Sequence, residues 1–375
     1  MSTRVVAVAG GGTAGHVFPS LAVASVLEAE GDLGTIFLGS RDRLEGQLVP
    51  AAGHRFEHVE AIPLPRRLSP RLVAVPFQLQ RAIKRCVEIL TTEQVVGVVT
   101  FGGYVSFPVN VAARRLGLPL VIHEQNSVPG IANRLASGWA DRVAVTYPGS
   151  ADSFRHPERT AVTGNPVRKE MLSASGLDRA AARESFGLKP DVPTLLVFGG
   201  SQGARALNRA IVASAPHWGD LQVQILHAAG AALHREAAAD WEKARRDQAG
   251  LGVRCVDFID DMAAAYAAAD VVVCRAGATS IAELTVQGKP SVLVPYPHAT
   301  ADHQRHNAEA LARVGAARMI LDDELTGERI AAEVRPLLED GETLHRMIAS
   351  SRSFGRADAA DAVARLLREL LPEAA

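Results

Sequence analysis

The chain has 375 residues, of which 47% are hydrophobic, so it can form packed cores and is not disordered throughout. At about 150 residues per domain, this length favours two domains. The 40 lysines and arginines nearly balance the 41 aspartates and glutamates, which argues against a dedicated nucleic-acid-binding protein. Cys86, Cys255 and Cys274 lie far apart, with neither metal-ligand spacing nor a disulfide framework, so we expect a reducing compartment.

The first residues do not form a signal peptide, because a short apolar run ends at once in glycines. No apolar run approaches the roughly 20 residues that a membrane-spanning helix needs. We therefore expect a soluble or peripheral cytoplasmic protein.

Two series of short apolar runs alternate with helical patterns, and each series predicts the strands of one sheet. The first comprises Arg4–Ala9, Thr35–Leu38, Val95–Thr100, Leu120–His123 and Arg142–Val145. The second comprises Thr194–Phe198, Val223–His227, Val253–Val256, Val271–Cys274 and Ser291–Val294. Runs that are apolar throughout are typical of parallel strands covered on both faces. The sequence therefore predicts an α/β protein with two Rossmann-like, doubly wound domains facing a cleft.

The predicted domains span residues 1–163 and 164–349, with Thr160–Asn165 and Pro166 as a plausible hinge. In the tail, apolar residues recur at helical spacing: Val363, Leu366, Leu367, Leu370 and Leu371. A helix over about 350–372 either closes the second domain or packs back on the first.

A glycine-rich loop follows the first strand of each series. Residues 10–15, GGGTAG, fit the dinucleotide-binding pattern G-x-G-x-x-G, and residues 199–204 read GGSQGA. Such loops let backbone N–H groups approach an anion at a helix N-terminus, although many are only tight turns. An NAD site is disfavoured, because the second strand ends in Gly39-Ser40-Arg41 without an acid. Ser40 and Arg41 suit a 2′-phosphate, so an NADP enzyme stays open.

A sugar nucleotide explains both loops better than one dinucleotide does. Its diphosphate would lie at Gly199–Gly203, and His16 of the first loop would take a proton from an acceptor hydroxyl. Alternatively, His16 caps its helix or bonds a backbone carbonyl. The sequence has no D-x-D pair, and Asp260-Asp261 and Asp322-Asp323 are adjacent, so we predict no metal and no cofactor. Backbone amides, helix dipoles and arginine would then meet the diphosphate charge.

Six stretches in this order carry a resemblance to a known family: GGGTAGHVFP, FGGYVSFP, HEQN, GNPVR, GGSQGAR and RAGATSIAELTVQGKPSVLVPYPHATADHQRHNA. From Val5 to about Gly315 the chain resembles the MurG family of peptidoglycan glycosyltransferases. Ala14 replaces a glycine that is frequent in such loops. The resemblance implies a GT-B fold and a metal-independent, inverting transfer of N-acetylglucosamine. The donor is UDP-N-acetylglucosamine, and the acceptor is the 4-hydroxyl of the muramyl sugar of lipid I, giving lipid II.

The resemblance also implies roles for individual residues. His16 is the candidate base, assisted by Thr13 and Tyr104, with His123 and Glu124 as alternatives. Glu283 would bind the ribose, and the Ile259 backbone would bind the uracil. Ser201 and Arg168 would bind the diphosphate. Alternatively, Glu283 is an ordinary first-turn helix acid, and Arg168 is a solvated linker residue. The full set that would bind the donor is Thr13, Ala14, Gly15, Asn126, Arg168, Ser201, Ile259, Ala278, Thr279, Ser280, Ile281, Ala282, Glu283 and Gln304. Arg305 stands where some relatives carry a second glutamine.

Between Arg66 and Arg85 the sequence has six basic residues and no acid, interspersed with apolar ones. This composition suits an anionic membrane surface, although a helix with a core face and a solvated basic face would look similar. The predicted patch comprises Arg67, Arg71, Leu72, Val75, Phe77, Leu79 and Lys84. The resemblance implies a peripheral protein on the cytoplasmic face of the bacterial inner membrane, with cell-wall synthesis and division proteins as further partners.

Three classes of function stay open. The first is the transferase. The second is another enzyme of the same architecture, either a UDP-sugar epimerase or an NADP oxidoreductase. The third is a non-catalytic, membrane-associated scaffold that keeps sugar-nucleotide binding.

Overall fold

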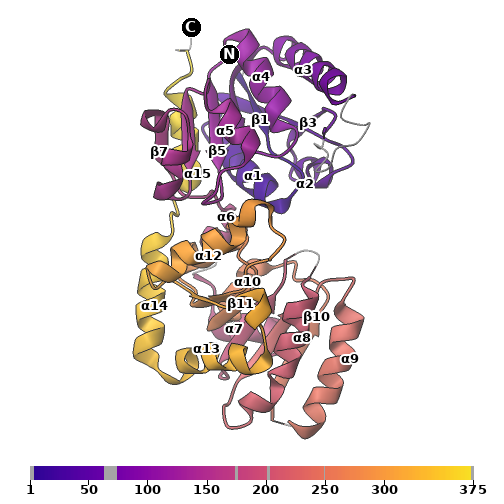
Figure 1. Ribbon diagram of the computed structural model, residues 1–375, viewed down its shortest axis with the longest axis vertical. Coiled ribbons are helices and arrows are strands. Elements are labelled where there is room, and N and C mark those ends of the chain that lie inside the picture. The colour runs from indigo at the N-terminus through magenta and orange to yellow at the C-terminus, as the bar shows by residue number, and fades with distance from the viewer. Residues whose placement is uncertain (1–3, 63–73, 174–175, 201–202, 249, 373–375) are drawn as a thin grey trace. The chain divides into compact units, whose positions relative to one another are not determined.

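The computed structural model describes residues 4–62, 74–173, 176–200, 203–248 and 250–372. It divides into two compact units (Figure 1). Unit 1 comprises Met1–Arg168 and Ala357–Ala375, and unit 2 comprises Lys169–Arg356. The division lies slightly after the boundary that the sequence suggests, at the end of the GNPVR stretch.

Unit 1 is built on a seven-stranded sheet with the order β3-β2-β1-β4-β5-β6-β7. The strands are β1 Arg4–Ala9, β2 Leu33–Gly39, β3 Arg55–His58, β4 Val95–Thr100, β5 Leu120–Glu124, β6 Arg142–Val145 and β7 Thr160–Val162. The helices are α1 Ala14–Ala29, α2 Leu44–Ala51, α3 Val75–Thr92, α4 Ser106–Leu116, α5 Ile131–Ala136 and α15 Ala359–Arg368, with 3₁₀ turns at Pro148–Ser153 and Pro157–Arg159.

Both faces of this sheet are covered, as its apolar strands predict. In β1, Val6 and Val8 pack with α1 and α15, whereas Ala7 and Ala9 pack with α3 and α4. All strand pairs described in the sheet are parallel. The sheet is therefore doubly wound, with β1 and β4 side by side where the chain direction across the sheet reverses.

Unit 2 repeats the plan with a six-stranded parallel sheet, β10-β9-β8-β11-β12-β13. The strands are β8 Thr194–Phe198, β9 Gln224–Ala228, β10 Gly252–Val256, β11 Val271–Cys274, β12 Ser291–Leu293 and β13 Arg318–Met319. The helices are α6 Lys169–Ser173, α7 Arg179–Ser185, α8 Arg205–Ala213, α9 His234–Ala244, α10 Met262–Ala268, α11 Ala278–Gln287, α12 His303–Arg313, α13 Gly327–Glu339 and α14 Gly341–Phe354. The 3₁₀ turns are Ala215–Trp218, Arg245–Asp247, Thr300–Asp302 and Asp322–Glu324.

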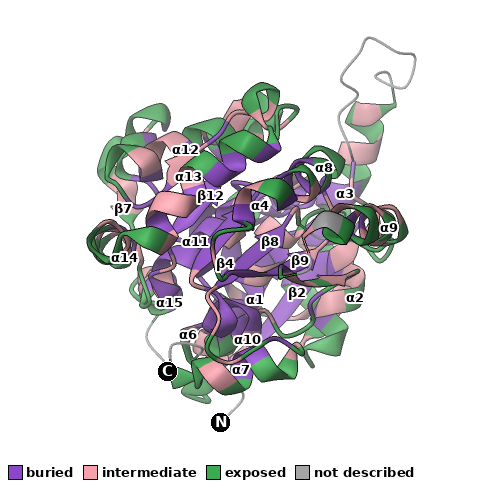
Figure 2. Cartoon of the chain, turned by 90° about the horizontal axis from the view of Figure 1, so that it is seen from below, coloured by how far each residue is buried: buried purple, intermediate pink, exposed green. Residues whose placement is uncertain are grey.

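The two sheets confirm the predicted pair of Rossmann-like domains. Central strands such as β4 and β8 are buried, and the outer faces of α9 and α14 are exposed (Figure 2). Three strands were not predicted: β3, β7 and β13. They lie at sheet edges and are short or polar. The proposed hinge at Thr160–Asn165 is wrong in its first half, because Thr160–Val162 pairs with β6.

The C-terminal helix α15 belongs to unit 1, where Figure 1 shows it in yellow beside α1 and β5. Val363 and Leu367 are buried in the core on that face of the sheet. Arg368 binds both carboxylate oxygens of Asp32. A Cβ atom on Gly97 of β4 would lie 2.5 Å from the Leu371 side chain, so the missing side chain allows this close approach.

Replacing Leu367 with alanine will lower the free energy of unfolding of unit 1 by about 2–4 kcal/mol, because Leu367 is 1% exposed. Hydrogen exchange will measure this as faster exchange of the β4 and β5 amides, with those of β8 and β11 unchanged. Arg365→Ala, on the exposed side of the same helix, is the control. Equal loss of protection in both sheets would show that α15 does not belong to unit 1 alone.

Candidate active site

The first glycine loop lies at the carboxyl edge of the sheet of unit 1, at the reversal point between β1 and β4. Ligands of doubly wound sheets bind at this position. A Cβ on Gly10 would lie 2.9 Å from the Cβ of Phe101, which follows β4. Gly103 has φ +88°, and a Cβ there would collide with the Gly11 carbonyl oxygen. Glycine is thus required both in the loop after β1 and in the loop after β4, and the backbones of these two loops are in contact.

His16 lies in the first turn of α1 with its ring turned back to the loop. Its Nδ1 is 2.9 Å from the Gly11 carbonyl oxygen and 3.2 Å from the Thr13 hydroxyl. Because a carbonyl oxygen only accepts hydrogen bonds, Nδ1 carries the proton, and the neutral ring has its lone pair on Nε2. A Cβ on Gly102 would lie 3.2 Å from this Nε2, so a side chain there would crowd the basic nitrogen. His16 therefore does bond a backbone carbonyl, through Nδ1. This bond leaves the lone pair on Nε2, so the same histidine can also act as a base.

The two alternative bases are engaged elsewhere. His123 is 0% exposed, donates from Nε2 to the Gly164 carbonyl at 2.9 Å and accepts at Nδ1 from the Gln125 amide at 3.1 Å. Burial lowers the pKa of His123 to about 4. Glu124 is 2% exposed and accepts from the backbone N–H groups of Asn126 and Gly130 and from the Asn126 and Asn133 amides. These contacts occupy both oxygens of the Glu124 carboxylate and hold the loop after β5 in place.

The remaining candidates of unit 1 gather at the same edge. Thr13 precedes α1, Ala14 and Gly15 begin it, and Tyr104 follows Gly103 with 45% of its surface exposed. Asn126 is the second residue after β5, and its amide donates to Glu124 at 3.3 Å. These positions surround the His16 loop on neighbouring strand ends.

Arg168 ends unit 1, and its guanidinium stacks on the ring of Phe18 with 4.2 Å between the guanidinium carbon and the ring centroid. Cation–π stacking of this kind orients a guanidinium while preserving its charge. Phe18 lies in α1, two residues after His16. Arg168 is therefore a partly buried residue held beside the first loop, and not a solvated linker arginine.

The second glycine loop lies at the corresponding edge of unit 2, where β8 and β11 are neighbours. Gly200 and Gly203 have φ values of +91° and +74°, and a Cβ on Gly203 would collide with the Ala229 carbonyl oxygen. This carbonyl is fixed by the Asn208 amide at 2.8 Å, and Asn208 in turn accepts from His227. Ser201, the predicted phosphate ligand, lies outside the described residues.

The loop after β11 leads into α11, which carries Ala278, Thr279, Ser280, Ile281, Ala282 and Glu283. Gly277 caps this helix without a side-chain hydrogen bond to its first N–H groups, the arrangement in which a helix N-terminus attracts an anion. Glu283 is in the second turn, not the first. It is 6% exposed and accepts from the Tyr266 hydroxyl at 3.0 Å, which fixes the orientation of its carboxylate.

Two further candidates of unit 2 lie at the same strand ends. Ile259 follows β10 with its side chain 5% exposed, beside Phe258, which is 53% exposed. Gln304 is the second residue of α12 and accepts at Oε1 from the Tyr296 N–H at 3.0 Å, so its NH₂ group is the part that can donate to a sugar. Ala301 and Asp302 just before it have φ near +50°, a strained conformation for residues other than glycine. Arg305 pairs with Glu309 at 2.9 Å.

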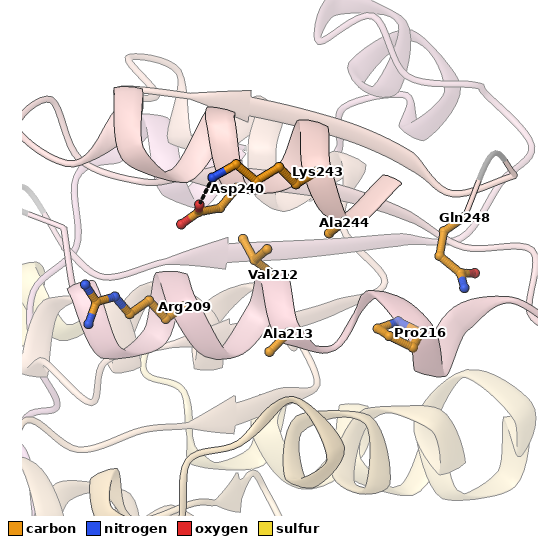
Figure 3. Close-up of a pocket in the computed structure, with 8 residues that line it drawn as sticks. All are labelled: Arg209, Val212, Ala213, Pro216, Asp240, Lys243, Ala244 and Gln248. Atoms are coloured by element: carbon orange, nitrogen blue, oxygen red, sulfur yellow. Dashed lines mark ion pairs between the residues drawn. The ribbon is translucent and has the colours of Figure 1, made fainter. Parts of the chain in front are cut away.

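A groove of about 400 Å³ lies elsewhere in unit 2, between α8 and α9. Figure 3 shows Arg209 and Pro216 along one side and Asp240 and Lys243 along the other, the latter two ion-paired at 3.6 Å. These residues come from the later parts of helices that run antiparallel to the strands, so the groove faces the amino edge of the sheet. Among the residues that the structure describes, no residue of the glycine loop and no candidate site residue lines it, so the groove forms no part of the candidate site.

The predicted membrane patch is only partly visible, because Arg67, Arg71 and Leu72 lie outside the described residues. In α3, Phe77 is 75% exposed and Lys84 is exposed, but Val75 and Leu79 pack against the core of the unit. The sequence between Arg66 and Arg85 contains no acid, but acids from elsewhere in the chain neutralise part of its positive charge. Arg81 pairs with Glu60, and Arg85 with Glu57 at 2.8 Å, both from the segment around β3.

None of the helices in the described ranges is both long and apolar enough to cross a membrane. In the same ranges, no group of three or more histidine, cysteine, aspartate or glutamate side chains is arranged to hold a metal ion.

One functional candidate was missed altogether, namely Glu45 in the first turn of α2. Its Oε2 accepts from the Gly12 N–H at 2.8 Å, so it belongs to the first glycine loop. The last residues of β2 include no acid. However, the chain turns back after β2, so the first turn of α2 brings the Glu45 carboxylate close to the carboxyl end of that strand. The signal was an acid in the first turn of a helix, four residues after Gly39-Ser40-Arg41.

We expect the protein to become less stable as the pH falls, because two of its histidines are buried. Burial lowers the pKa of His123 and of His227 to about 4, below the ordinary value of 6.5. Between pH 6.5 and 4 the unfolded chain binds protons that the folded chain does not, so stability falls as the pH falls through this window. The full loss is about 3 kcal/mol for each histidine.

Denaturant unfolding at pH 6.5 and at pH 5, above the usual carboxylate range, measures this dependence. His227→Gln will be less stable at both pH values, with a smaller difference between them. His298→Gln, at an exposed histidine, will keep the wild-type difference. An unchanged pH difference in His227→Gln would contradict the assignment.

Two doubly wound units, each with a glycine loop at its reversal point, define the GT-B class of sugar-nucleotide enzymes. The sequence matches the glycosyltransferase family 28 N-terminal domain over residues 6–145 and the glycosyltransferase family 28 C-terminal domain over residues 194–363. The chain belongs to glycosyltransferase family 28.

Its relatives include proteins named UDP-N-acetylglucosamine–N-acetylmuramyl-(pentapeptide) pyrophosphoryl-undecaprenol N-acetylglucosamine transferase. One from Nocardioides sp. is 43% identical over 371 residues, covering 97% of this chain and 98% of the relative. One from Desulforamulus reducens is 41% identical over 368 residues, with the same coverage. Among solved structures, MurG of Acinetobacter baumannii is 30% identical with a TM-score of 0.77, covering 98% of this chain and 99% of that one. A UDP-GlcNAc 2-epimerase from Neisseria meningitidis has a TM-score of 0.71 at 12% identity, a likeness of fold alone.

Proposed function

We propose that this protein transfers N-acetylglucosamine from UDP-N-acetylglucosamine to the 4-hydroxyl of the muramyl sugar of lipid I, with inversion at the anomeric carbon. The observation that carries the proposal is identity above 40%, over 97% of the chain, to transferases named for this reaction. The glycine loops at both reversal points support it.

On the acceptor side, His16 is the proposed base. The Gly11 carbonyl holds its Nδ1–H, and Nε2 takes the proton of the acceptor hydroxyl as the oxygen attacks the anomeric carbon. Thr13 steadies the ring through the 3.2 Å contact with Nδ1. Tyr104, Ala14, Gly15 and Asn126 complete the proposed surroundings of the two sugars.

On the donor side, unit 2 is the proposed UDP site. Glu283 accepts from the ribose hydroxyls in the orientation that Tyr266 imposes, and the Ile259 backbone bonds the uracil. The N-terminus of α11, whose N-cap Gly277 has no side chain, and the second glycine loop, including Ser201, meet the diphosphate. The Arg168 guanidinium stabilises the negative charge that develops on the departing UDP, and the Gln304 amide binds the transferred sugar.

The rival functions are less well supported. An epimerase needs acids at the anomeric centre, whereas Glu124 is committed to four N–H donors. An NADP enzyme needs Ser40 for a 2′-phosphate, but the Ser40 N–H donates to the buried Glu45 carboxylate at 3.2 Å. A carboxylate at that position repels a phosphate.

The test is UDP release from UDP-N-acetylglucosamine, with and without a short-chain lipid I analogue, in the presence of EDTA. We expect release only with the acceptor, and no effect of EDTA. UDP-sugar binding without acceptor-dependent release would reject the transferase in favour of an epimerase or a scaffold. Release that EDTA abolishes would reject metal independence alone.

We also propose peripheral attachment to the cytoplasmic face of the inner membrane through α3 and the segment before it. Exposed Phe77, with exposed Lys84 on the same helix, is the described part of this surface. An apolar ring inserts at the lipid interface, while cations are attracted to anionic headgroups.

Replacing Phe77 with serine will reduce binding to vesicles that contain anionic lipid by about tenfold, since the ring removes apolar area from water. Cosedimentation measures the binding, and turnover with a water-soluble acceptor will be unchanged. Leu116→Ser, at a less exposed apolar residue on α4, is the control. If both variants bind vesicles like the wild type, α3 does not form the contact.

A further inference from the structure

The buried carboxylate of Glu45 accepts a hydrogen bond from a backbone N–H of the first glycine loop. Glu45 is 1% exposed, and its Oε2 and Oε1 accept from the N–H groups of Gly12 and Ser40 at 2.8 and 3.2 Å. The carboxylate fills the space beside Gly11, where a Cβ would collide with it. Its Cγ would be 2.7 Å from a Cβ on Gly39. Both glycines are therefore required for Glu45 to fit.

This arrangement changes what the loop can bind. In dinucleotide-binding domains, the N–H groups of this turn and the positive end of the following helix hold a diphosphate. Here one N–H group of the turn before α1, that of Gly12, already bonds an anion of the protein itself. A second anion would have to displace the carboxylate or lie beside it.

We propose that Glu45 determines the specificity of the first glycine loop by acting as a built-in anion, which excludes phosphate groups and leaves the loop to an uncharged sugar. Gly12 and Thr13 are exposed, while the Gly12 N–H points to Glu45. The loop thus offers the neutral Thr13 hydroxyl and the His16 ring to its ligand. The sugar part of this inference rests on the proposed function, whereas the exclusion of phosphate does not.

The test follows the Gly12 amide by NMR in protein labelled with ¹⁵N-glycine, during titration with inorganic pyrophosphate in saturating UDP. Gly12→Asn identifies the signal, because asparagine tolerates the φ of +84° and nothing lies within 4 Å of a Cβ there. The variants are Glu45→Ala, which removes the anion and opens its space, and Glu45→Gln, which removes the charge alone. Glu28→Gln is the control, since Glu28 also accepts a backbone N–H in unit 1, that of Thr35 at 3.1 Å.

We expect no pyrophosphate-dependent shift of Gly12 in the wild type or in Glu28→Gln. The Gly12 signal of Glu45→Ala will shift saturably, at pyrophosphate concentrations at least tenfold below the highest one that leaves the wild-type signal unchanged, and Glu45→Gln will lie between them. A wild-type Gly12 signal that titrates like that of Glu45→Ala would overturn the proposal. So would a natively folded Glu45→Ala that does not respond. If Glu45→Ala fails to fold, the test rests on Glu45→Gln. A Gly12 signal in Glu45→Gln that responds to pyrophosphate no more than the wild-type signal does would then refute the proposal. Because no turnover is measured, failure of the transferase proposal would leave this result interpretable.

Discussion

Replacing His16 with alanine will reduce the rate of sugar transfer by roughly 10²–10⁴-fold, the usual contribution of a general base. The affinity for UDP will be unchanged, because the proposed contacts with the uracil and the ribose, Ile259 and Glu283, belong to unit 2. Single-turnover kinetics with a soluble lipid I analogue measures the rate, and calorimetry with UDP measures the affinity.

Thr13→Val is the matched variant for His16. It removes the hydroxyl contact with Nδ1 but leaves the Gly11 carbonyl to hold the ring. We expect a loss of tenfold or less, because the tautomer with its lone pair on Nε2 is kept. Transfer by His16→Ala within a few-fold of the wild type would remove the histidine from the chemistry. A larger loss in Thr13→Val than in His16→Ala would move the role to the hydroxyl.

The second large effect is expected at Glu283. Its replacement by alanine will weaken binding of UDP and UDP-N-acetylglucosamine by about 10–100-fold, the cost of losing hydrogen bonds to a charged group. Calorimetry with UDP and with uridine measures the loss, which must appear for both ligands if the ribose is the contact.

Tyr266→Phe separates binding from folding at this position. Glu283→Ala also removes the 3.0 Å bond from the Tyr266 hydroxyl, and that hydroxyl lies on a side chain that is 0% exposed. Tyr266→Phe removes the same bond but keeps the carboxylate, so we expect most of the affinity to remain. Equal losses of affinity in the two variants would mean that Glu283 acts by packing and not by contact with the ribose.

The central strands and both glycine loops could be predicted from the sequence, because parallel strands buried on both faces are apolar throughout. The edge strands could not. β3 reads Arg-Phe-Glu-His, and β13 has only two residues, so neither shows an apolar run. Their pairing is decided by the neighbouring strand, β2 for one and β12 for the other.

Within the candidate site, residues in contiguous motifs were easier to find than those brought in by folding. Thr13 and His16 lie in one motif, and their contact follows from helical spacing. Glu45 reaches Gly12 across 33 positions, and Tyr266 reaches Glu283 across 17. The pairing of Arg81 and Arg85 with acids near β3 escaped for the same reason, since charge balance on a surface is set by neighbours in space.

The most direct measurement of the central claim is the structure of the product formed from UDP-N-acetylglucosamine and a soluble lipid I analogue. Mass spectrometry and NMR would define the new linkage and its anomeric configuration. The account predicts one N-acetylglucosamine joined β(1→4) to the muramyl sugar, with one UDP released for each disaccharide formed. An α-linked product, or conversion of the donor to an epimer without any disaccharide, would contradict it.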